Sequence, residues 1–451
     1  MSLISLNDLK DHLQDCVSIN GTSFTLRSRR LFVERHLDDL VFESIFNEDA
    51  ALRKRIRQLI HAVGRECHII PASMQRFYEA RATSALGGMT IAAIGLPTLS
   101  YDLACAVFRA AGRLRVGGFA FSLSRDELET TGQSFDEFAA VIIAAALRER
   151  WQGPVFLLAS RLQADARHFV ARPAGEMSAL RQLIDDALRA GFYNIDLDTS
   201  PLIDKGCSTL SEQLYRNYAQ SAELTAYIRR VEPRGVTVSV GATLGAAGDR
   251  NSTEEDLNSF MAGYNKALAA GRYGAKGLCK IVVQTCKQAY GVPLPDGQIV
   301  SLSLDMNLLR RLSYRARADF GLAGAVQQVS ADWPLDIYDR FVNTDTAEIH
   351  LSDVVQDIVL EGLHLHSSLH AEMDRFLKRE CANQWSDGMT EAAFLHRMRG
   401  RAWKAFKQPL WELSRAPRLE ISALLESRIQ IIFEKLGLSN TRELVAKTLE
   451  P

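Results

Sequence analysis

The stretch EMSALRQLIDDALRAGFYNIDLDTS, residues 176–200, contains the repeating unit on which the fold of this chain depends. Its first part, residues 176–191, has apolar residues at helical spacing, which predicts an amphipathic helix. Its second part, residues 193–198, is a short, largely apolar run that ends in acidic residues and predicts a buried strand. Buried strands that alternate with helices are typical of a parallel sheet covered on both faces.

The same alternation of strand and helix occurs eight times between residues 86 and 361. Each predicted strand is a short apolar or β-branched run: TIAAIG from Thr90, GGFAFSL from Gly117, PVFLLA from Pro154, YNIDLD from Tyr193, VTVSVG from Val236, KIVVQT from Lys280, AGAVQQ from Ala323 and TAEIHL from Thr346. Eight such units predict an α/β protein with a closed (β/α)8 TIM barrel. An open doubly wound sheet is the alternative, but no G-x-G-x-x-G motif follows the first predicted strand.

Segments with helical periodicity flank the barrel, for example DAALRKRIRQLIHAVGREC from Asp49. We therefore divide the chain into a helical N-terminal extension at residues 1–85, the barrel at residues 86–361 and a helical C-terminal extension at residues 362–451. The arginine-rich stretches LRKRIRQL and RMRGRAWKAFK alternate with apolar residues, and we interpret them as solvated helix faces.

The composition excludes several classes of protein. With 47% hydrophobic residues, 24% charged residues and a formal net charge of -1, the chain has no basic field to attract nucleic acid or a membrane surface. It has no apolar run long enough to cross a membrane, and the first residues lack the apolar core of a signal peptide. Its seven cysteines show no C-x-x-C spacing, which favours reduced, buried thiols over disulfides or a zinc site. These features predict a cytoplasmic protein.

The carboxyl ends of the strands predict the position of the functional site, because TIM-barrel sites lie at that end. The third strand ends in a polar turn at Ser160 and Arg161. Candidate residues at the other strand ends are Asp198, Thr243, Gln284, Lys287, Tyr290, Gln328, Ser352 and Asp357. Amides, hydroxyls and cations dominate this set, and they do not form a group suited to a divalent metal ion. We interpret His350, at the end of the eighth strand, as a core residue.

These segments resemble the class II, metal-dependent ketose-bisphosphate aldolases, and in particular the long-chain fructose-bisphosphate aldolases. The resemblance covers roughly residues 85–440 and includes YDLACAVFRAA, RAGFYNIDLDTSPLID, VTVSVG, NSTEEDLNSFMAGYN, GVPLPDG, GLAGAVQ, TAEIHL and PLWEL. The stretch AGFYNIDLDTS is also similar to the non-catalytic partner subunit of tagatose-bisphosphate aldolase. The resemblance implies a TIM barrel in which histidines and a glutamate hold a zinc ion and an aspartate moves a proton.

This chain departs from the family at the positions that hold the metal. Ser160 and Arg161 replace the family's Asp-His pair, and Thr243 and Ala246 replace its glutamates. Ala289 and Gln328 stand where the family has histidine ligands, and Asp357 stands where it has an asparagine. Alanine and arginine do not ligate a cation, and threonine and glutamine are poor substitutes for the family's ligands. We therefore predict no catalytic metal ion and no cofactor.

Two functions follow from this loss. The first is a non-catalytic paralogue, a pseudo-aldolase that serves as a partner subunit in sugar-phosphate metabolism. The alternative is a repurposed, metal-independent enzyme, a carbon–carbon lyase of the aldolase type, and the sequence leaves open whether the chain is active. In that enzyme Arg161 and Lys287 would bind a phosphate or carboxylate and stabilise an enolate, or Lys287 would form a Schiff base. Asp198 or Asp357 would carry the proton, and Tyr290 is a weaker candidate.

The predicted ligand is a phosphorylated sugar or a similar small anion, in contact with Ser160, Arg161, Thr243, Gln284, Tyr290, Gln328 and Ser352. A sensor that binds this anion without turnover remains a further possibility. The predicted protein partners are further copies of the chain or an active paralogue. The stretch LHLHSSLH places His364, His366 and His370 close together, and we interpret them as surface histidines of a helix.

Overall fold

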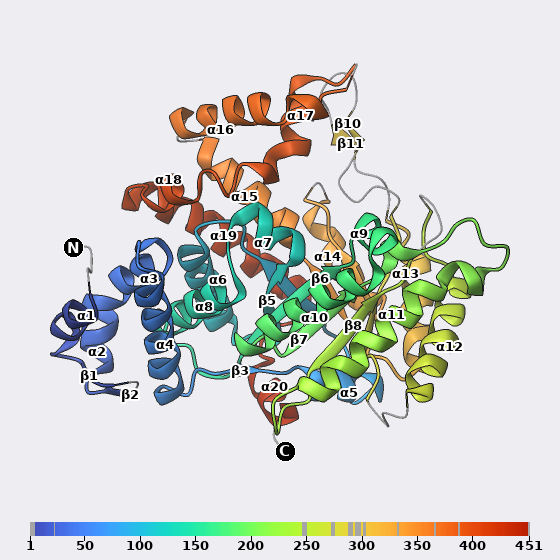
Figure 1. Cartoon of the computed structure of the whole chain (residues 1–451), viewed down its shortest axis with the longest axis horizontal. Helices are drawn as coiled ribbons and strands as arrows, with labels where there is room; N and C mark the ends of the chain where they lie inside the picture. The colour runs from blue at the N-terminus through green and yellow to red at the C-terminus, as the bar shows by residue number, and fades with distance from the viewer. Residues whose placement is uncertain are drawn as a thin grey trace.

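The structure is a computed structural model that describes residues 5–21, 23–245, 250–271, 276–286, 292–293, 299–300, 304–331, 333–364, 367–386 and 388–449. At its centre, eight parallel strands form one closed sheet (Figure 1). These strands are β4 (Ile91–Gly95), β5 (Phe119–Ser124), β6 (Val155–Gln163), β7 (Asn194–Asp198), β8 (Ser239–Thr243), β9 (Lys280–Val282), β12 (Ala325–Gln328) and β13 (Glu348–His350). Each strand pairs with the next, β13 returns to β4, and the predicted (β/α)8 barrel is confirmed.

Helices follow the strands around the outside of the barrel. They are α6 (Ser100–Leu114), α7 (Arg125–Thr131), α8 (Phe135–Arg148), α9 (Ala166–Ala171), α10 (Pro173–Arg189), α11 (Leu210–Val231), α12 (Glu254–Ala270), α13 (Met306–Ala318), α14 (Tyr338–Asn343) and α15 (Ser352–His364), with short turns η2 (Ser200–Leu202) and η3 (Leu335–Ile337). Side chains at the N-termini fix several of these helices. Thr209 and Glu212 form a capping box on α11, and Thr253 and Asp256 form one on α12.

The third barrel strand does not end in a turn at Ser160 and Arg161, and that part of the prediction is wrong. Strand β6 continues to Gln163, and its register with β7 shifts between Ala159 and Leu162. Arg161 lies in this irregular segment with φ 45°, a left-handed conformation that residues with a side chain rarely adopt. The polar residues that the sequence placed after the strand are therefore part of a bulged strand.

The N-terminal extension contains helices and short strands. Its elements are α1 (Leu6–Leu13), β1 (Val17–Asn20), β2 (Ser23–Leu26), α2 (Arg29–Leu31), the π-helical turn η1 (Phe32–His36), α3 (Leu37–Phe46), α4 (Ala50–Glu66), β3 (Pro71–Ala72) and α5 (Gln75–Ala82). Strands β1 and β2 form an antiparallel hairpin, and β3 pairs in parallel with β6 outside the barrel. Helix α4 packs closely on α8, where a Cβ atom at Gly64 would lie 2.7 Å from the Ile143 side chain.

The C-terminal extension runs along the barrel from its mouth to its opposite end (Figure 1). Its elements are α16 (Ser367–Glu380), η4 (Ala382–Gln384), α17 (Glu391–Met398), η5 (Arg399–Arg401), α18 (Lys407–Trp411), α19 (Arg415–Lys435) and α20 (Arg442–Leu449). Arg109 of α6 holds α19 through an ion pair of 2.6 Å with Glu426. Near the start of β5, Gly117 donates its backbone N–H to Thr441. The same extension therefore contacts both ends of the barrel.

Two remaining structural findings concern the cysteines and the helices. None of the seven cysteines forms a disulfide, and Cys16, Cys105, Cys279 and Cys286 are buried. No helix in the described part of the chain combines the length and apolar character needed to cross a bilayer.

A cluster of charged side chains fills part of the barrel interior. The Lys280 ammonium lies 2.5 Å from Glu348 Oε1 and 3.2 Å from Asp196 Oδ1, and all three side chains are completely buried. Glycine at position 241 of the intervening strand makes this arrangement possible. A Cβ atom there would lie 2.2 Å from Asp196 Oδ1 and 3.0 Å from Lys280 Cε.

We predict that Gly241→Ala lowers the free energy of unfolding by about 2–3 kcal/mol, because the added methyl group overpacks the charged cluster. Urea denaturation measures this loss. Gly112→Ala in α6 is the matched control, because a Cβ atom there meets nothing within 4 Å and alanine favours helix. Equal stability of the two variants would contradict the proposed crowding at Gly241.

Candidate functional site

A cavity of about 1060 Å³ opens at the carboxyl ends of the barrel strands. We call it the mouth cavity. Its polar wall residues from the barrel are Ser124, Asp126, Glu127, Thr130, Thr131, Ser160, Arg161, Asp198, Ser200, Thr243, Gln284, Gln327, Gln328, His350, Ser352, Asp353 and Gln356. The C-terminal extension closes the cavity on one side with Gln384, His396, Arg397, Arg399, Arg401 and Trp403. The structure thus places a large polar cavity at the end of the barrel that the sequence pointed to.

Most of the candidate residues from the sequence meet in this wall, namely Ser160, Arg161, Asp198, Thr243, Gln284, Gln328 and Ser352. Asp357 is not among the wall residues, and its carboxylate lies 3.1 Å from Arg399 Nε. Lys287 and Tyr290 lie outside the described residues, as do Ala246 and Ala289. The catalytic and binding roles assigned to all these residues stay predictions.

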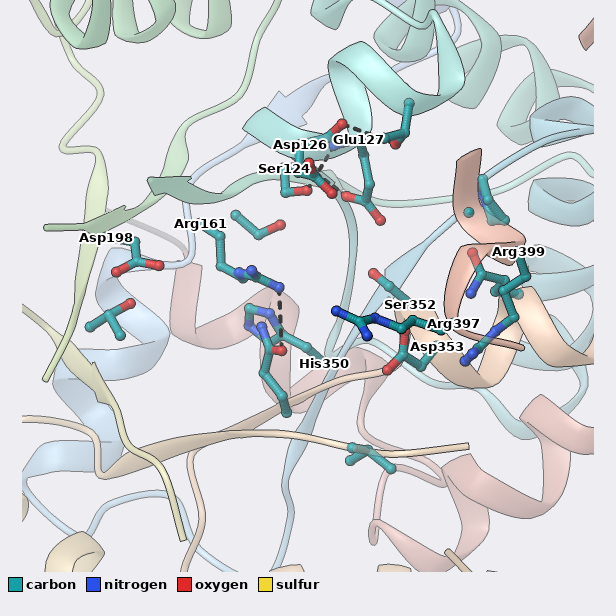
Figure 2. A pocket seen from close by; sticks show the side chains of 18 of the residues that line it. Ser124, Asp126, Glu127, Arg161, Asp198, His350, Ser352, Asp353, Arg397 and Arg399 are labelled. Atoms are coloured by element: carbon teal, nitrogen blue, oxygen red, sulfur yellow. Dashed lines mark hydrogen bonds between the residues drawn. The ribbon is translucent and has the colours of Figure 1, made fainter. Parts of the chain in front are cut away.

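The bulge in β6 carries Arg161 into the mouth cavity (Figure 2). Arg161 Nη1 donates a hydrogen bond of 3.5 Å to Gln328 Oε1 on β12. Asp198 of β7 fixes the other side of the bulge, because it accepts hydrogen bonds from Gln163 Nε2 at 2.7 Å and from Ser200 Oγ at 2.6 Å. Asp198 therefore anchors the segment that holds Arg161, and a strained backbone supported in this way is typical of functional sites.

A second part of the wall depends on the absence of a side chain at Gly95, the last residue of β4. A Cβ atom at Gly95 would lie 2.1 Å from Ser352 Oγ and 3.0 Å from Glu127 Oε1. Ser124 and Glu127 form the capping box of α7, so the Glu127 carboxylate is also held by the Ser124 backbone N–H at 2.7 Å. Glycine at this position lets Ser352 and Glu127 approach each other at the edge of the cavity.

The C-terminal extension contributes residues to the site that the sequence does not indicate. The spacing of RMRGRAWKAFK, residues 397–407, predicts a solvated helix face, whereas Arg397, Arg399 and Arg401 line the mouth cavity. Trp403 donates a hydrogen bond of 2.8 Å to Gln356 of α15 and so holds this segment against the barrel. Figure 2 shows Arg161 and Arg397 entering the cavity from different walls, with both guanidinium groups directed toward its interior. Helical spacing gave no signal for this placement, because it depends on how the extension folds back.

Asp353 is the wall carboxyl group with the most altered environment. Burial raises its pKa to about 6, and the neighbouring carboxylates of Asp357 and Glu127 act in the same direction. The guanidinium groups of Arg399 and Arg161 oppose this rise. A carboxyl group with such a pKa changes its charge near neutral pH and is suited to proton transfer.

The charged cluster of the barrel interior lies next to His350, which forms part of the cavity wall. The ring nitrogen Nε2 of His350 is 2.8 Å from Glu348 Oε1 and 3.6 Å from Asp196 Oδ2, and Tyr78 donates a hydrogen bond to Glu348 Oε2. Burial by itself raises the pKa of Glu348, but Lys280 and His350 outweigh it and lower the pKa to about 2. For Asp196 burial prevails and raises the pKa. His350 therefore joins the cavity wall to a buried ion pair between Lys280 and Glu348.

The described residues do not fit the divalent metal ion that the resemblance implies. Arg161 places a cation where the family has a ligand, and Thr243 and Gln328 provide only neutral oxygens. Asp196, Glu348 and His350 have their possible ligand atoms within 4.8 Å of one another, but the Lys280 ammonium already supplies the cation for these carboxylates. We therefore derive no chemical step from a metal ion at the mouth.

Of the histidines at residues 364–370, only His370 has its side chain in the described part of the chain. His366 and the side chain of His364 lie outside it. His370 of α16 has its Nδ1 atom 3.4 Å from Asp374 Oδ2, one helical turn away.

Comparison with known proteins gives similarity in fold and no match in sequence. No protein-family model and no curated protein matches the chain. The fructuronate-tagaturonate epimerase UxaE from Cohnella laeviribosi has a similar structure, with a TM-score of 0.55 and 12% identity over 88% of this chain and 90% of that one. A probable tagatose 6 phosphate kinase from Sinorhizobium meliloti 1021 has a TM-score of 0.52 and 17% identity over 80% of this chain and 99% of that one.

A fructose-bisphosphate aldolase from Campylobacter jejuni is also among the similar structures. Its TM-score is 0.47, and it is 17% identical over 82% of this chain and 96% of the aldolase. The similarities to the epimerase and to the probable kinase establish a common barrel fold. They do not establish family membership or activity.

We predict that Lys280→Met lowers the free energy of unfolding by about 3–5 kcal/mol at pH 7, because it leaves Glu348 buried without its cation. With Lys280 present, the pKa of Glu348 is about 2. The stabilisation that the ionised Glu348 carboxylate provides is therefore lost only as pH falls through that value. Without Lys280 the pKa of Glu348 rises, and the difference between the two proteins shrinks as pH falls from 7 to 4. Chemical denaturation over this pH range measures the effect. A difference independent of pH would show that lost packing, and not lost charge pairing, explains the destabilisation.

Proposed function

We propose that this chain is a divergent relative of the class II aldolases that binds a phosphorylated or carboxylated sugar in the mouth cavity and does not cleave it. The observation that carries the proposal is the presence of Arg161 and Arg397 on different walls of one large polar cavity. Guanidinium groups bind phosphate and carboxylate with paired, charge-assisted hydrogen bonds, so two of them suit a small anion.

The surroundings of the two arginines support this proposal. Arg397 is exposed and forms no ion pair in the described part of the chain, which leaves its guanidinium group available to a ligand. Hydroxyl and amide groups such as Ser160, Thr243 and Gln284 lie in the same wall and suit the hydroxyl groups of a sugar. The metal positions of the family are occupied by residues that ligate a cation poorly or not at all, which removes the Lewis acid of its mechanism.

The names of the similar structures guide the choice of ligands for a test. One is an epimerase of the sugar acids fructuronate and tagaturonate, and one is a probable tagatose 6 phosphate kinase. Sugar acids and ketose phosphates are therefore the two classes of anion to compare by titration calorimetry.

We predict that Arg161→Ala and Arg397→Ala each weaken binding of the preferred anion by about 10- to 100-fold, since each removes charge-assisted hydrogen bonds. Isothermal titration calorimetry measures the affinity. Arg234→Ala is the matched control, because Arg234 is exposed before β8 and is not part of the cavity wall. If neither arginine variant differs from the control, the mouth cavity is not the anion site.

We also predict that a sugar acid binds about fivefold more tightly at pH 5 than at pH 7. Because the pKa of Asp353 is raised to about 6, the group is protonated at the lower pH and no longer repels an anion. The sugar carboxylate stays ionised in this range, whereas a phosphate would change its own charge. The pH dependence should disappear in Asp353→Asn, and its persistence in that variant would assign the effect to another group.

Absence of turnover is the part of the proposal that distinguishes a binding protein from an enzyme. We expect no cleavage of ketose bisphosphates by purified protein, with or without added chelator or zinc. If the protein cleaved a ketose bisphosphate and a chelator abolished this cleavage, the proposal that the site works without a metal ion would be wrong.

The second candidate function is a metal-independent enzyme, and Asp353 is the observation that favours it. A carboxyl group with a pKa of about 6 in the same cavity as Arg161 can exchange a proton with a bound sugar while the arginine stabilises negative charge. Exchange of substrate hydrogen with deuterated solvent, followed by NMR and lost in Asp353→Asn, would support this alternative.

A protein partner remains part of the proposal. A pseudo-aldolase that stabilises an active paralogue should co-purify with that paralogue from its native cells. Sedimentation of the purified chain alone distinguishes this mixed assembly from association of identical copies.

A further inference from the structure

A second group of possible ligands lies in the N-terminal extension, outside the barrel and separate from the mouth cavity. Asp15 and Cys16 connect α1 to β1, and His36 ends the π-helical turn η1. A carboxylate oxygen of Asp15, the Cys16 Sγ atom and a ring nitrogen of His36 all lie within 4.8 Å of one another. Residues 20 positions apart in the sequence thus bring three different donor types to one place.

His36 is held from both sides of its ring. Its Nε2 atom is 3.0 Å from Asp15 Oδ1, and its Nδ1 atom is 3.1 Å from Nε2 of His12 in α1. The side chain of His36 is only 10% exposed, so the ring cannot turn freely into solvent. Single π-helical turns within a helical segment are frequent at functional sites, and here the turn ends at His36.

Cys16 is completely buried, and its thiol faces the same group. Burial raises the pKa of Cys16 to about 12, and the neighbouring Asp15 carboxylate adds to this rise. The Sγ atom lies 3.5 Å from the Leu13 carbonyl oxygen. The thiol is therefore protonated at neutral pH, and a bound cation would have to displace its proton.

We propose that Asp15 Oδ1, Cys16 Sγ and His36 Nε2 form a zinc site, with a fourth position open to water. Thiolate, imidazole and carboxylate are the ligands that zinc uses in proteins. The charges of one thiolate and one carboxylate balance those of the dication. Asp15 is exposed, which leaves a path for the ion and for the water ligand.

The neighbours of the three ligands suit this role. A histidine that binds a metal ion generally donates its other ring N–H to an acceptor, and His12 Nε2 is in the correct position to accept from His36 Nδ1. Arg35 lies 3.6 Å from the other carboxylate oxygen of Asp15, Oδ2, and so leaves Oδ1 directed at His36. Zinc binding requires the neutral His36 ring to carry its proton on Nδ1, which leaves Nε2 for the ion. The neutral His12 ring then carries its proton on Nδ1 and accepts through Nε2, and the Cys16 thiol proton is released to solvent.

The ion would join the segment after α1 to the turn before α3. Both ligand-bearing segments belong to the N-terminal extension, whose α3 and α4 pack against α8 of the barrel. The ion would therefore stabilise the N-terminal extension and take no part in chemistry at the mouth cavity. This inference is independent of the proposed sugar-binding function.

The test uses the full chain, freed of metal and titrated with zinc and with cobalt(II). We expect one zinc ion per chain, and a cobalt(II) complex with the near-ultraviolet charge-transfer absorption of a cobalt–thiolate bond. Asp15→Asn, His36→Gln and Cys16→Ser should each abolish stoichiometric binding, and His12→Gln should weaken it by about 10- to 100-fold. Chelator should lower the Tm of the wild-type protein and leave the Tm of Cys16→Ser unchanged.

Cys67→Ser is the control, because Cys67 is a partly exposed thiol of the same extension outside the group. It should bind zinc and cobalt(II) as the wild type does. Asp15→Asn keeps the test valid if Cys16→Ser fails to fold, since Asp15 is at the surface. The proposal is overturned if folded wild-type protein binds no zinc, or if Asp15→Asn and His36→Gln bind it as tightly as the wild type.

Discussion

Closure of the parallel sheet is the constraint on which the rest of this structure depends. Because all eight barrel strands run in the same direction, their carboxyl ends meet at one mouth, and residues far apart in the sequence share one cavity. The pairing of β6 with β7 is part of this closure, and the register shift between Ala159 and Leu162 lies within it. The register shift that lets β6 pair with β7 also brings Arg161 into the mouth cavity. One irregular strand therefore contributes both to closure of the barrel and to the charge of the cavity wall.

The interior of the barrel contains a buried cationic side chain, that of Lys280. Lys280 lies between Glu348 and Asp196, and glycine at position 241 leaves the space for it. Burying these charges is costly, and only mutual pairing offsets that cost. His350 extends the cluster to the wall of the mouth cavity. An ammonium group therefore stands among carboxylate and imidazole side chains that would otherwise suit a metal ion.

The two extensions have different relations to the barrel. The C-terminal extension completes the cavity with Arg397 and Arg399 and then runs to the opposite end of the barrel, where Thr441 accepts a hydrogen bond from Gly117. The N-terminal extension packs on the outside against α8, and its group of Asp15, Cys16 and His36 is an independent feature of that unit.

The sequence by itself determined the barrel, because alternation of apolar strands with amphipathic helices depends on local periodicity. All eight predicted strands are present, and the rule that sites lie at strand ends located Ser160, Arg161, Asp198 and Gln328 in one cavity wall. Tertiary structure alone decided the bulge at Arg161, the pairing of Lys280 with Glu348, the return of Arg397 to the mouth, and the meeting of Cys16 with His36. The reason is physical. Periodicity indicates which face of a helix or strand is buried. The contacts named above join different elements, and the separation of two elements in the sequence does not indicate how close they lie in the folded protein.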